Sequence, residues 1–441
     1  MALNPLEKSD LHVHLWGCYY PEDLFEMAGD SYNDIDWNRF DFLDRYEEVF
    51  GVRPDPVQIF EEAKQTGSLD KIMQIAVLKP EDAGDFDRFD VKTFFAIAIT
   101  GYFIDEGRHE EILDPLLRRH KAEGIEYIEY RYSFGGNGFE DWHIRVHEHF
   151  RKYAGAGFSP KGIVRLYDKG LESYIRLKNL IETRPDILNT IVGVDFSGRE
   201  TAPKHLKSFF DELHADNFAN PEGSLDAVIH VGEVFFDKSL ESAIRWCHEA
   251  AELGAKRLGH CIALGISPEV AIRRRPLAHA RETTEERIDQ LHYDLTHYGD
   301  LRSYGLDLDE YEILEELSEL NKRQPDEVVT NVYDEKRLQE IRLRQDFVLE
   351  KLKELGTVIE ICPTSNIMIG GIPGIVHHPF RKFLDSGVNM VICSDDPGVF
   401  NSPLAAEIKV IAESFKIHPD ELAERLGDPR RFRLGIREEA D

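Results

Sequence analysis

The chain has 441 residues, and its 53 Lys and Arg against 83 Asp and Glu give a formal charge of −30. This negative balance argues against a nucleic-acid polymer or an anionic membrane as partner, because both require a basic surface. Hydrophobic residues make up 42% of the chain and charged residues 31%, a balance typical of soluble globular enzymes.

Other sequence features indicate a cytoplasmic protein. The longest apolar stretch, at residues 94–104, has about half of the ~20 residues that a membrane-spanning helix needs. The N-terminal residues MALNPLEKSD lack the basic and apolar regions of a secretory signal. The five cysteines include no CxxC pair, so we expect reduced thiols in the cytoplasm.

Short β-type runs alternate with long helical patterns along the whole chain. The predicted strands are residues 10–15, 127–131, 162–166, 191–195, 227–230, 257–260, 358–362 and 390–394. Strands separated by helices are typical of an α/β fold with a parallel sheet. Eight such units predict a (β/α)8 TIM barrel, with residues 1–441 forming a single domain.

Two connections are too long to be simple barrel loops, which predicts helical insertions after strand 1 and strand 6. The first lies within residues 16–126, and the second is the charged helical segment 262–350. Long insertions on the catalytic face of a barrel often form lids or contact partners. Segment 262–350 is therefore interpreted as a lid or a homo-oligomer surface, or alternatively as a solvated helical hairpin held by salt bridges.

Histidines and an aspartate at the ends of predicted strands indicate a metal site. His12 and His14 point the same way because a strand has a period of two, and His230 and Asp395 end the fifth and eighth strands. Three imidazoles and one carboxylate suit one zinc ion, although iron and manganese accept the same ligands. The fourth strand ends at Asp195 without the lysine that bridges two ions in related barrels, so a single ion is favoured.

Two further residues provide the acid and base that a metal-dependent hydrolysis needs. A bound ion lowers the pKa of its water toward 7, but protons must still be moved to and from the substrate. Glu233 lies three residues after His230, and His260 ends the sixth predicted strand. Both are predicted to be catalytic without binding the metal.

The motifs DLHVHLWG, YIEYRYS, IVGVDFSGRE, HVGE, RLGHC, EICPTSN and SDDPGVF occur in the order seen in the adenosine/AMP deaminase family of the amidohydrolase superfamily. The chain resembles this family from about residue 10 to 415, interrupted at 262–350. The resemblance implies a zinc-dependent hydrolytic deaminase of a 6-aminopurine nucleoside, nucleotide or derivative. The products would be the 6-oxopurine and ammonia.

The resemblance also implies roles for individual residues. Glu233 would protonate the ring nitrogen beside the attacked carbon, and His260 would orient and deprotonate the water. The backbone N–H of Gly198 would meet the purine N3. Asp396 would accept a hydrogen bond from the N7 side of the ring.

Two positions depart from the family pattern. Trp16 replaces an Asp that touches ribose in the nucleoside enzymes, and Arg199-Glu200 replaces Asp-Glu. We hypothesise that the substrate is not plain adenosine and that Arg199 meets a phosphate or carboxylate on it. The alternative is that Trp16 packs in the mouth of the site and Arg199 is solvated.

Two other functions remain as alternatives. The first is a mononuclear amidohydrolase acting on another C–N or C–O bond, and Glu233 argues against it because many such enzymes lack a carboxylate there. The second is a catalytically silent barrel that serves as a binding or assembly module through 262–350. Outside these motifs, His143 and His147 are spaced to bind a metal on a helix but are expected to form a solvated face.

Overall fold

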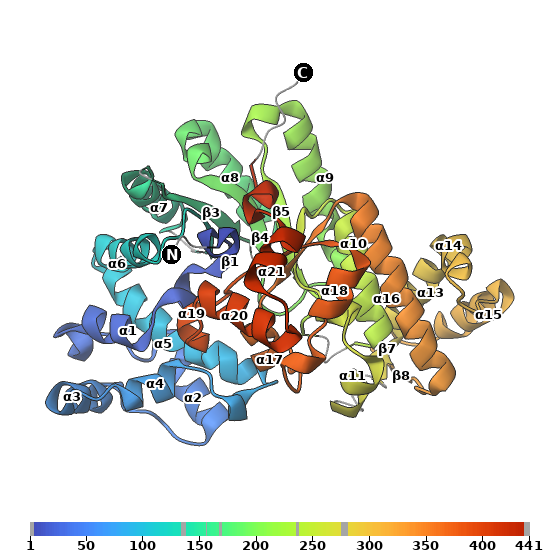
Figure 1. Cartoon of the computed structure of the whole chain (residues 1–441), viewed down its shortest axis with the longest axis horizontal. Coiled ribbons are helices and arrows are strands. Elements are labelled where there is room, and N and C mark those ends of the chain that lie inside the picture. The colour runs from blue at the N-terminus through green and yellow to red at the C-terminus, as the bar shows by residue number, and fades with distance from the viewer. Residues whose placement is uncertain are drawn as a thin grey trace.

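An eight-stranded parallel sheet forms the centre of the computed structural model, which describes residues 4–133, 138–155, 157–166, 170–234, 238–274 and 281–435 (Figure 1). The strands are β1 Ser9–His14, β2 Tyr127–Tyr132, β3 Ser159–Arg165, β4 Ile191–Phe196, β5 Asp226–Val231, β6 Arg257–His260, β9 Val358–Ile361 and β10 Asn389–Ile392. They are hydrogen-bonded in the order β1-β2-β3-β4-β5-β6-β9-β10. All eight predicted strands, and the predicted (β/α)8 barrel, are confirmed.

The barrel closes between the first strand and the end of the last. His14 N donates to Asp395 O at 2.7 Å, and Asp395 N donates to His12 O at 2.9 Å. These two bonds form a parallel bridge centred on Val13 and Asp395. The closing seam therefore includes three of the four predicted metal ligands, His12, His14 and Asp395.

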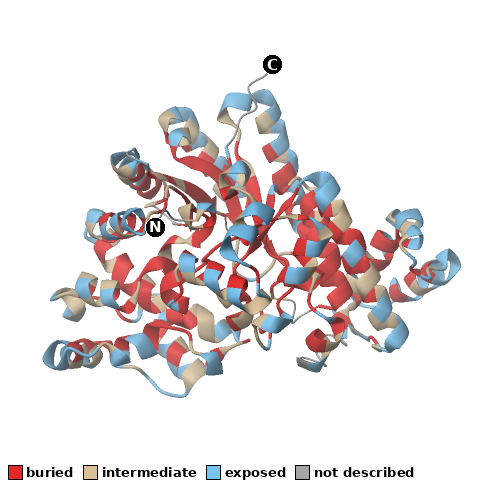
Figure 2. Ribbon diagram, in the orientation of Figure 1, coloured by how far each residue is buried: buried red, intermediate tan, exposed pale blue. Residues whose placement is uncertain are grey.

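Helices cover the outside of the barrel. They include α7 Phe139–Tyr153, α8 Leu171–Thr183, α9 Pro203–Ala219, α10 Leu240–Glu252, α17 Pro363–Met368, α18 Phe380–Ser386, α19 Pro397–Phe400, α20 Leu404–Phe415 and α21 Pro419–Leu426. Figure 2 shows the buried residues concentrated on the central strands and on the helix faces turned toward them. Every residue of β4 is buried, as expected for a parallel strand enclosed on both faces.

The first insertion, between β1 and β2, is helical as predicted. It contains α1 Pro21–Ala28, α2 Phe42–Phe50, α3 Pro56–Thr66, α4 Asp70–Ala76, α5 Phe86–Asp105 and α6 Glu110–Ala122. The apolar stretch of the sequence lies in α5, where Phe95, Ile99 and Phe103 repeat every four residues and are fully buried. No helix in the described ranges is both long enough and apolar enough to cross a bilayer.

The second insertion, between β6 and β9, is also helical. It contains α11 Pro268–Arg274, β7 Arg281–Thr283, α13 Thr284–Thr296, α14 Tyr298–Ser303, α15 Glu310–Leu320, β8 Val328–Thr330 and α16 Glu335–Leu355. β7 and β8 pair antiparallel. Leu291, Ile313, Leu317 and Leu320 form a small core inside the insertion. Its last helix, α16, packs against α10 of the barrel, so the segment is anchored to the barrel wall.

Candidate active site

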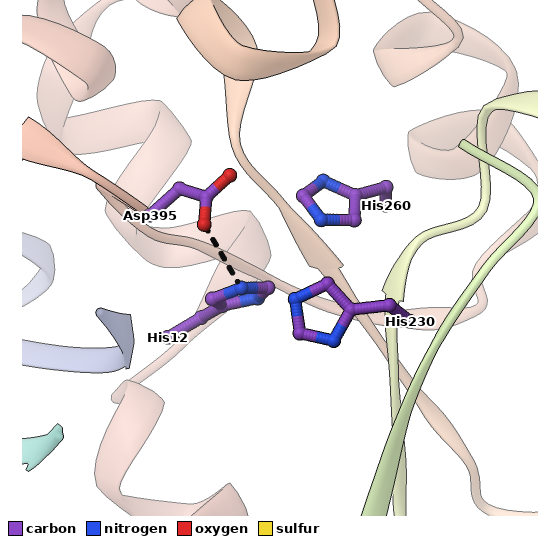
Figure 3. A group of neighbouring side chains, drawn as sticks. All are labelled: His12, His230, His260 and Asp395. Atoms are coloured by element: carbon purple, nitrogen blue, oxygen red, sulfur yellow. Dashed lines mark ion pairs between the residues drawn. The ribbon is translucent and has the colours of Figure 1, made fainter. Parts of the chain in front are cut away.

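Five predicted site residues meet at the carboxyl ends of four strands. His12 and His14 lie on β1, His230 on β5, His260 at the end of β6, and Asp395 after β10. Figure 3 shows the side chains of His12, His230, His260 and Asp395 turned toward one another. The backbones of His260 and Asp395 are left-handed, with φ of 69° and 63°, a conformation that a side chain disfavours and that often marks functional sites.

The spacing of the donor atoms fits a bound cation. His14 Nε2 lies 3.1 Å from His230 Nε2 and 3.4 Å from His12 Nε2. Asp395 Oδ1 lies 3.2 Å from His12 Nε2 and 3.3 Å from His14 Nε2. Ligands about 2.0–2.1 Å from a tetrahedral zinc ion are separated by about 3.3–3.4 Å. Three imidazole nitrogens and one carboxylate oxygen at this spacing are therefore suited to a divalent metal ion.

Two buried carboxylates behind the histidines orient their rings. His230 Nδ1 lies 3.2 Å from Asp195 Oδ1, and His12 Nδ1 lies 3.0 Å from Glu360 Oε2. In both histidines the contact uses Nδ1, so Nε2 faces the other donor atoms of the cluster, the arrangement typical of metal-binding histidines. Burial alone would raise the pKa of Asp195 and Glu360, but the guanidinium of Arg131 holds both below their ordinary values.

Arg257 extends this ion-pair network below the site. Its side chain is 1% exposed and pairs with Glu129, and its Nε donates to Glu360 Oε1 at 2.7 Å. It also donates to the carbonyl oxygens of Leu11 at 3.1 Å and Phe432 at 2.8 Å. Arg257 therefore joins β1, β2, β6 and β9 beneath the histidines.

Hydrogen bonds determine which nitrogen of His260 carries the proton. Phe380 N donates to His378 Nδ1 at 3.0 Å, so the other nitrogen of His378 donates to Asn366 Oδ1 at 2.9 Å. Burial lowers the pKa of His378 to about 3, consistent with this neutral ring. Asn366 Nδ2 then donates to His260 Nδ1 at 2.9 Å. His260 is therefore protonated at Nε2, a buried atom with no hydrogen-bond partner among the described residues.

Glu233 is held at the same rim by its neighbours. Ser365 Oγ donates to its carboxyl at 3.1 Å, and His260 Nδ1 lies 3.4 Å from it. Glu200 accepts the backbone N–H groups of Gly232, Glu233 and Val234 at 2.7–3.0 Å and so fixes the loop after β5. Burial, and then the charges of Asp395 and Glu200, raise the pKa of Glu233 well above its usual range. The surroundings of the Glu233 carboxyl therefore favour its protonated form.

A cavity of about 300 Å³ opens onto these residues. It is lined on one side by His14, His230, Glu233, His260, Asp395 and Asp396, and on the other by residues of α5. Gly198, which also lines it, has φ of 93°, and a Cβ there would come 2.6 Å from Arg165 Nη2. The structure brings all eight predicted site residues together. Seven of them line this cavity, and the eighth, His12, contacts His14 and Asp395 without lining it.

Trp16 and Arg199 also line the cavity but differ in their surroundings. Trp16 stacks on Trp142 with ring centroids 5.4 Å apart. Arg199 has a side chain that is 73% exposed and pairs with Asp87 at 2.6 Å. Trp16 therefore forms part of the cavity wall, while Arg199 stands at its solvent edge.

The prediction that His143 and His147 form a solvated helix face is wrong. Both side chains are buried, and His147 contacts Thr190 Oγ1 at 2.7 Å and Asp186 Oδ2 at 3.1 Å. Their helix, α7, turns this face toward the barrel. The two rings therefore serve the packing of the core.

Comparison with known proteins gives matches in sequence and in fold. Residues 326–426 match the family model described as adenosine deaminase. Adenine deaminase of Rhizobium leguminosarum bv. trifolii is 44% identical over 68 residues, which are 15% of this chain and 21% of that protein. The adenosine deaminase-like protein of Drosophila melanogaster is 37% identical over 65 residues, 15% of this chain and 19% of that protein. These alignments span only about a fifth of each relative.

Solved structures match the fold over nearly the whole chain. The adenine deaminase of Arthrobacter aurescens has a TM-score of 0.56 at 14% identity, covering 98% of this chain and 95% of that one. The Arabidopsis N6-mAMP deaminase has a TM-score of 0.55 at 15% identity, covering 99% and 95%. An Arabidopsis protein solved with GMP also has a TM-score of 0.55 at 15% identity, covering 99% and 94%.

The segment that matches the family model contains two of the motifs that carry the resemblance, EICPTSN after β9 and SDDPGVF after β10. Asp395, which lies within it, is the carboxylate of the metal-type cluster. The resemblance of the chain to the adenosine deaminase family is thus confirmed through residues 326–426.

Proposed function

We propose that the protein is a metal-dependent hydrolase that removes the 6-amino group of an aminopurine nucleoside, nucleotide or derivative. The observation that carries this proposal is the approach of three imidazole nitrogens and one carboxylate oxygen to 3.1–3.4 Å beside Glu233 and His260. The names of the relatives support it, since they include adenine deaminases and an N6-mAMP deaminase.

His12, His14, His230 and Asp395 would hold one ion. Their nitrogen and oxygen donors suit zinc, and iron or manganese would accept the same set. A bound ion of this kind acts as a Lewis acid and makes hydroxide available near neutral pH. Asp195 and Glu360 would keep the rings of His230 and His12 in position for binding.

Glu233 and His260 act on the substrate and on the attacking oxygen. Glu233, whose protonated form is favoured by burial and by the charges of Asp395 and Glu200, would donate its proton to the ring nitrogen beside the amino-bearing carbon and make that carbon more electrophilic. His260 donates its Nε2–H toward the oxygen that attacks. The donor tautomer supports an orienting and charge-stabilising role for His260 rather than metal binding. With Nε2 already protonated, His260 would not deprotonate the water as the family resemblance implies, and the proton of the water would be released to solvent.

Gly198 and Asp396 would bind the purine ring from two sides of the cavity. The backbone N–H of Gly198 would donate to N3. Burial and the neighbouring charge of Asp395 raise the pKa of Asp396, so its carboxyl is also able to share a proton with the ring at N7. Both residues line the cavity that contains Glu233, which gives the ring a single plane in which to bind.

A panel of 6-aminopurines tests this function and its specificity. With the zinc-loaded protein we expect loss of the exocyclic amine from at least one of adenine, adenosine, AMP and N6-methyl-AMP. The loss is measured by ultraviolet absorbance and by the released amine, which is ammonia for the first three and methylamine for N6-methyl-AMP. A substituted or phosphorylated substrate should exceed adenosine in kcat/KM, because Trp16 occupies the place of a ribose-binding Asp. Adenosine as the single good substrate would contradict this specificity, and no turnover of any of the four would contradict the function.

Replacing His14 by Ala is expected to remove the metal from the barrel centre. The variant loses one of the four proposed donor atoms. Its free energy of unfolding should also fall, because metal binding contributes to the free energy of folding. Metal content per chain after dialysis, measured by inductively coupled plasma mass spectrometry, should fall by one equivalent. His418→Ala, at an exposed position, is the control and should keep the wild-type content. Full metal occupancy of His14→Ala would refute the ligand assignment.

A further inference from the structure

A second group of metal-type ligands lies outside the barrel, between α10 and the second insertion. His248 and Glu252 lie one turn apart near the end of α10, and His297 directly follows α13. His248 Nε2 lies 3.7 Å from Glu252 Oε1, and His297 Nε2 lies 3.9 Å from Glu252 Oε2. The three donor atoms all lie within 4.8 Å of one another.

The side chain of His248 is fixed with one nitrogen turned toward this group. Its Nδ1 lies 2.8 Å from the hydroxyl of Tyr293, so Nε2 is the nitrogen that faces Glu252. A hydrogen bond to the far nitrogen is the contact that usually orients a metal-binding histidine. His248 is 2% exposed, so this orientation is enforced by packing as well.

An aromatic wall holds the two imidazoles close together. The ring of Phe347 lies 5.7 Å from that of His248 and 6.0 Å from that of His297, and Tyr293 lies 4.4 Å from His297. The two imidazole centroids are 5.1 Å apart. Lys351, on the same helix as Phe347, pairs with Glu354 at 2.9 Å and with Asp300 at 3.6 Å.

We propose that His248, Glu252 and His297 bind a second zinc ion. Two imidazoles and one carboxylate are a common zinc ligand set. Each imidazole Nε2 lies 3.7–3.9 Å from one oxygen of Glu252, and the three donor atoms would have to draw together from within 4.8 Å to the about 3.3–3.4 Å of a tetrahedral site. The Glu252 side chain is 45% exposed, so solvent supplies the remaining position.

This ion would have a structural role. His248 and Glu252 belong to the barrel wall, whereas His297 belongs to the inserted segment 262–350. The ion would therefore clasp the insertion to the barrel at α13, in addition to the packing of α16 on α10. The inference depends on neither the deaminase activity nor the cluster at the barrel centre.

Metal content of the full-length protein tests the proposal. Wild type, His297→Gln and Glu252→Gln are dialysed against zinc and then against buffer, and zinc per chain is measured by mass spectrometry. Each variant is expected to hold one equivalent fewer than wild type. His292→Gln changes an exposed histidine on the same helix, α13, and should match wild type. Equal zinc content in wild type and both variants would overturn the proposal.

Further measurements distinguish loss of zinc at this second site from misfolding of the variant and from loss of zinc at the central cluster. Far-ultraviolet circular dichroism of Glu252→Gln should equal that of wild type, since the carboxylate is half-exposed at a helix end. Added zinc should raise the melting temperature of wild type by more than that of Glu252→Gln, and an identical rise would count against the clasp. His14→Ala should lose the zinc ion of the central cluster, whereas Glu252→Gln should lose the ion of the second site. The double variant His14→Ala/Glu252→Gln should therefore hold two equivalents of zinc fewer than wild type.

Discussion

Replacing Glu233 by Gln is expected to lower kcat on the best aminopurine by about 10²- to 10⁴-fold, the usual contribution of a general acid. The amide keeps the shape and the contact with Ser365 but has no acidic proton to give to the ring. Because Glu233 is not a proposed ligand, metal content per chain should not change. Ammonia release and metal analysis on the same preparation measure both quantities.

The matched control is Glu282→Gln, which changes another buried carboxylate, far along the chain in β7. Glu282 contacts Asn331 and Ser242 and does not line the cavity. Its replacement should leave kcat unchanged. Wild-type turnover in Glu233→Gln, or an equal loss in Glu282→Gln, would remove the role of Glu233 as the proton donor.

Replacing Arg257 by Met is expected to destabilise the protein by about 3–5 kcal/mol, as is typical when one partner of a buried ion pair is removed. Methionine has a similar length but leaves Glu129 without its guanidinium, and both residues are at most 1% exposed. Glu360 keeps Arg131, so most of the loss is expected at Glu129. Urea unfolding followed by circular dichroism measures the free energy of unfolding.

Arg199→Met provides the comparison for this effect. Arg199 also pairs with a carboxylate, Asp87, but its side chain is 73% exposed, and exposed pairs contribute at most about 1 kcal/mol. The two variants remove the same group from opposite environments. If Arg257→Met loses no more stability than Arg199→Met, the network beneath the histidines is not what holds these four strands together.

The barrel and the central cluster could be predicted because their signals are local. Several of the buried strands are short apolar runs, and HxH on β1 places two imidazoles on one side of a strand. Strand ends of a barrel share one rim, so His230, His260 and Asp395 could be assigned to the same place without knowing any distance.

The residues that orient the cluster could not be predicted in the same way. Glu360 contacts His12, and Asn366 contacts His260, although long stretches of sequence separate the two residues of each pair. The sequence assigned no role to Glu200, the residue after the departure at Arg199, whereas its carboxylate accepts three backbone N–H groups after β5. Such roles depend on rotamers and on which nitrogen carries a proton.

The histidines of α7 show a related limit. Helical spacing indicates that His143 and His147 share a face, but it does not tell what covers that face. In the fold the ring of His143 lies 4.3 Å from that of Phe139 and 5.2 Å from that of Tyr132. Phe139 belongs to α7 itself, but Tyr132 comes from β2, and the helical spacing alone does not predict that a strand covers this face.

The seam between β1 and the end of β10 has a consequence for synthesis of the protein. The ribosome makes His12 and His14 long before residue 395, which supplies the carboxylate beside them and the backbone that closes the barrel on them. A nascent chain that has passed His230 still carries three imidazoles on an open sheet. Such an intermediate lacks the Asp395 carboxylate, so the complete ligand set proposed for the ion would form only after the last strand has been made.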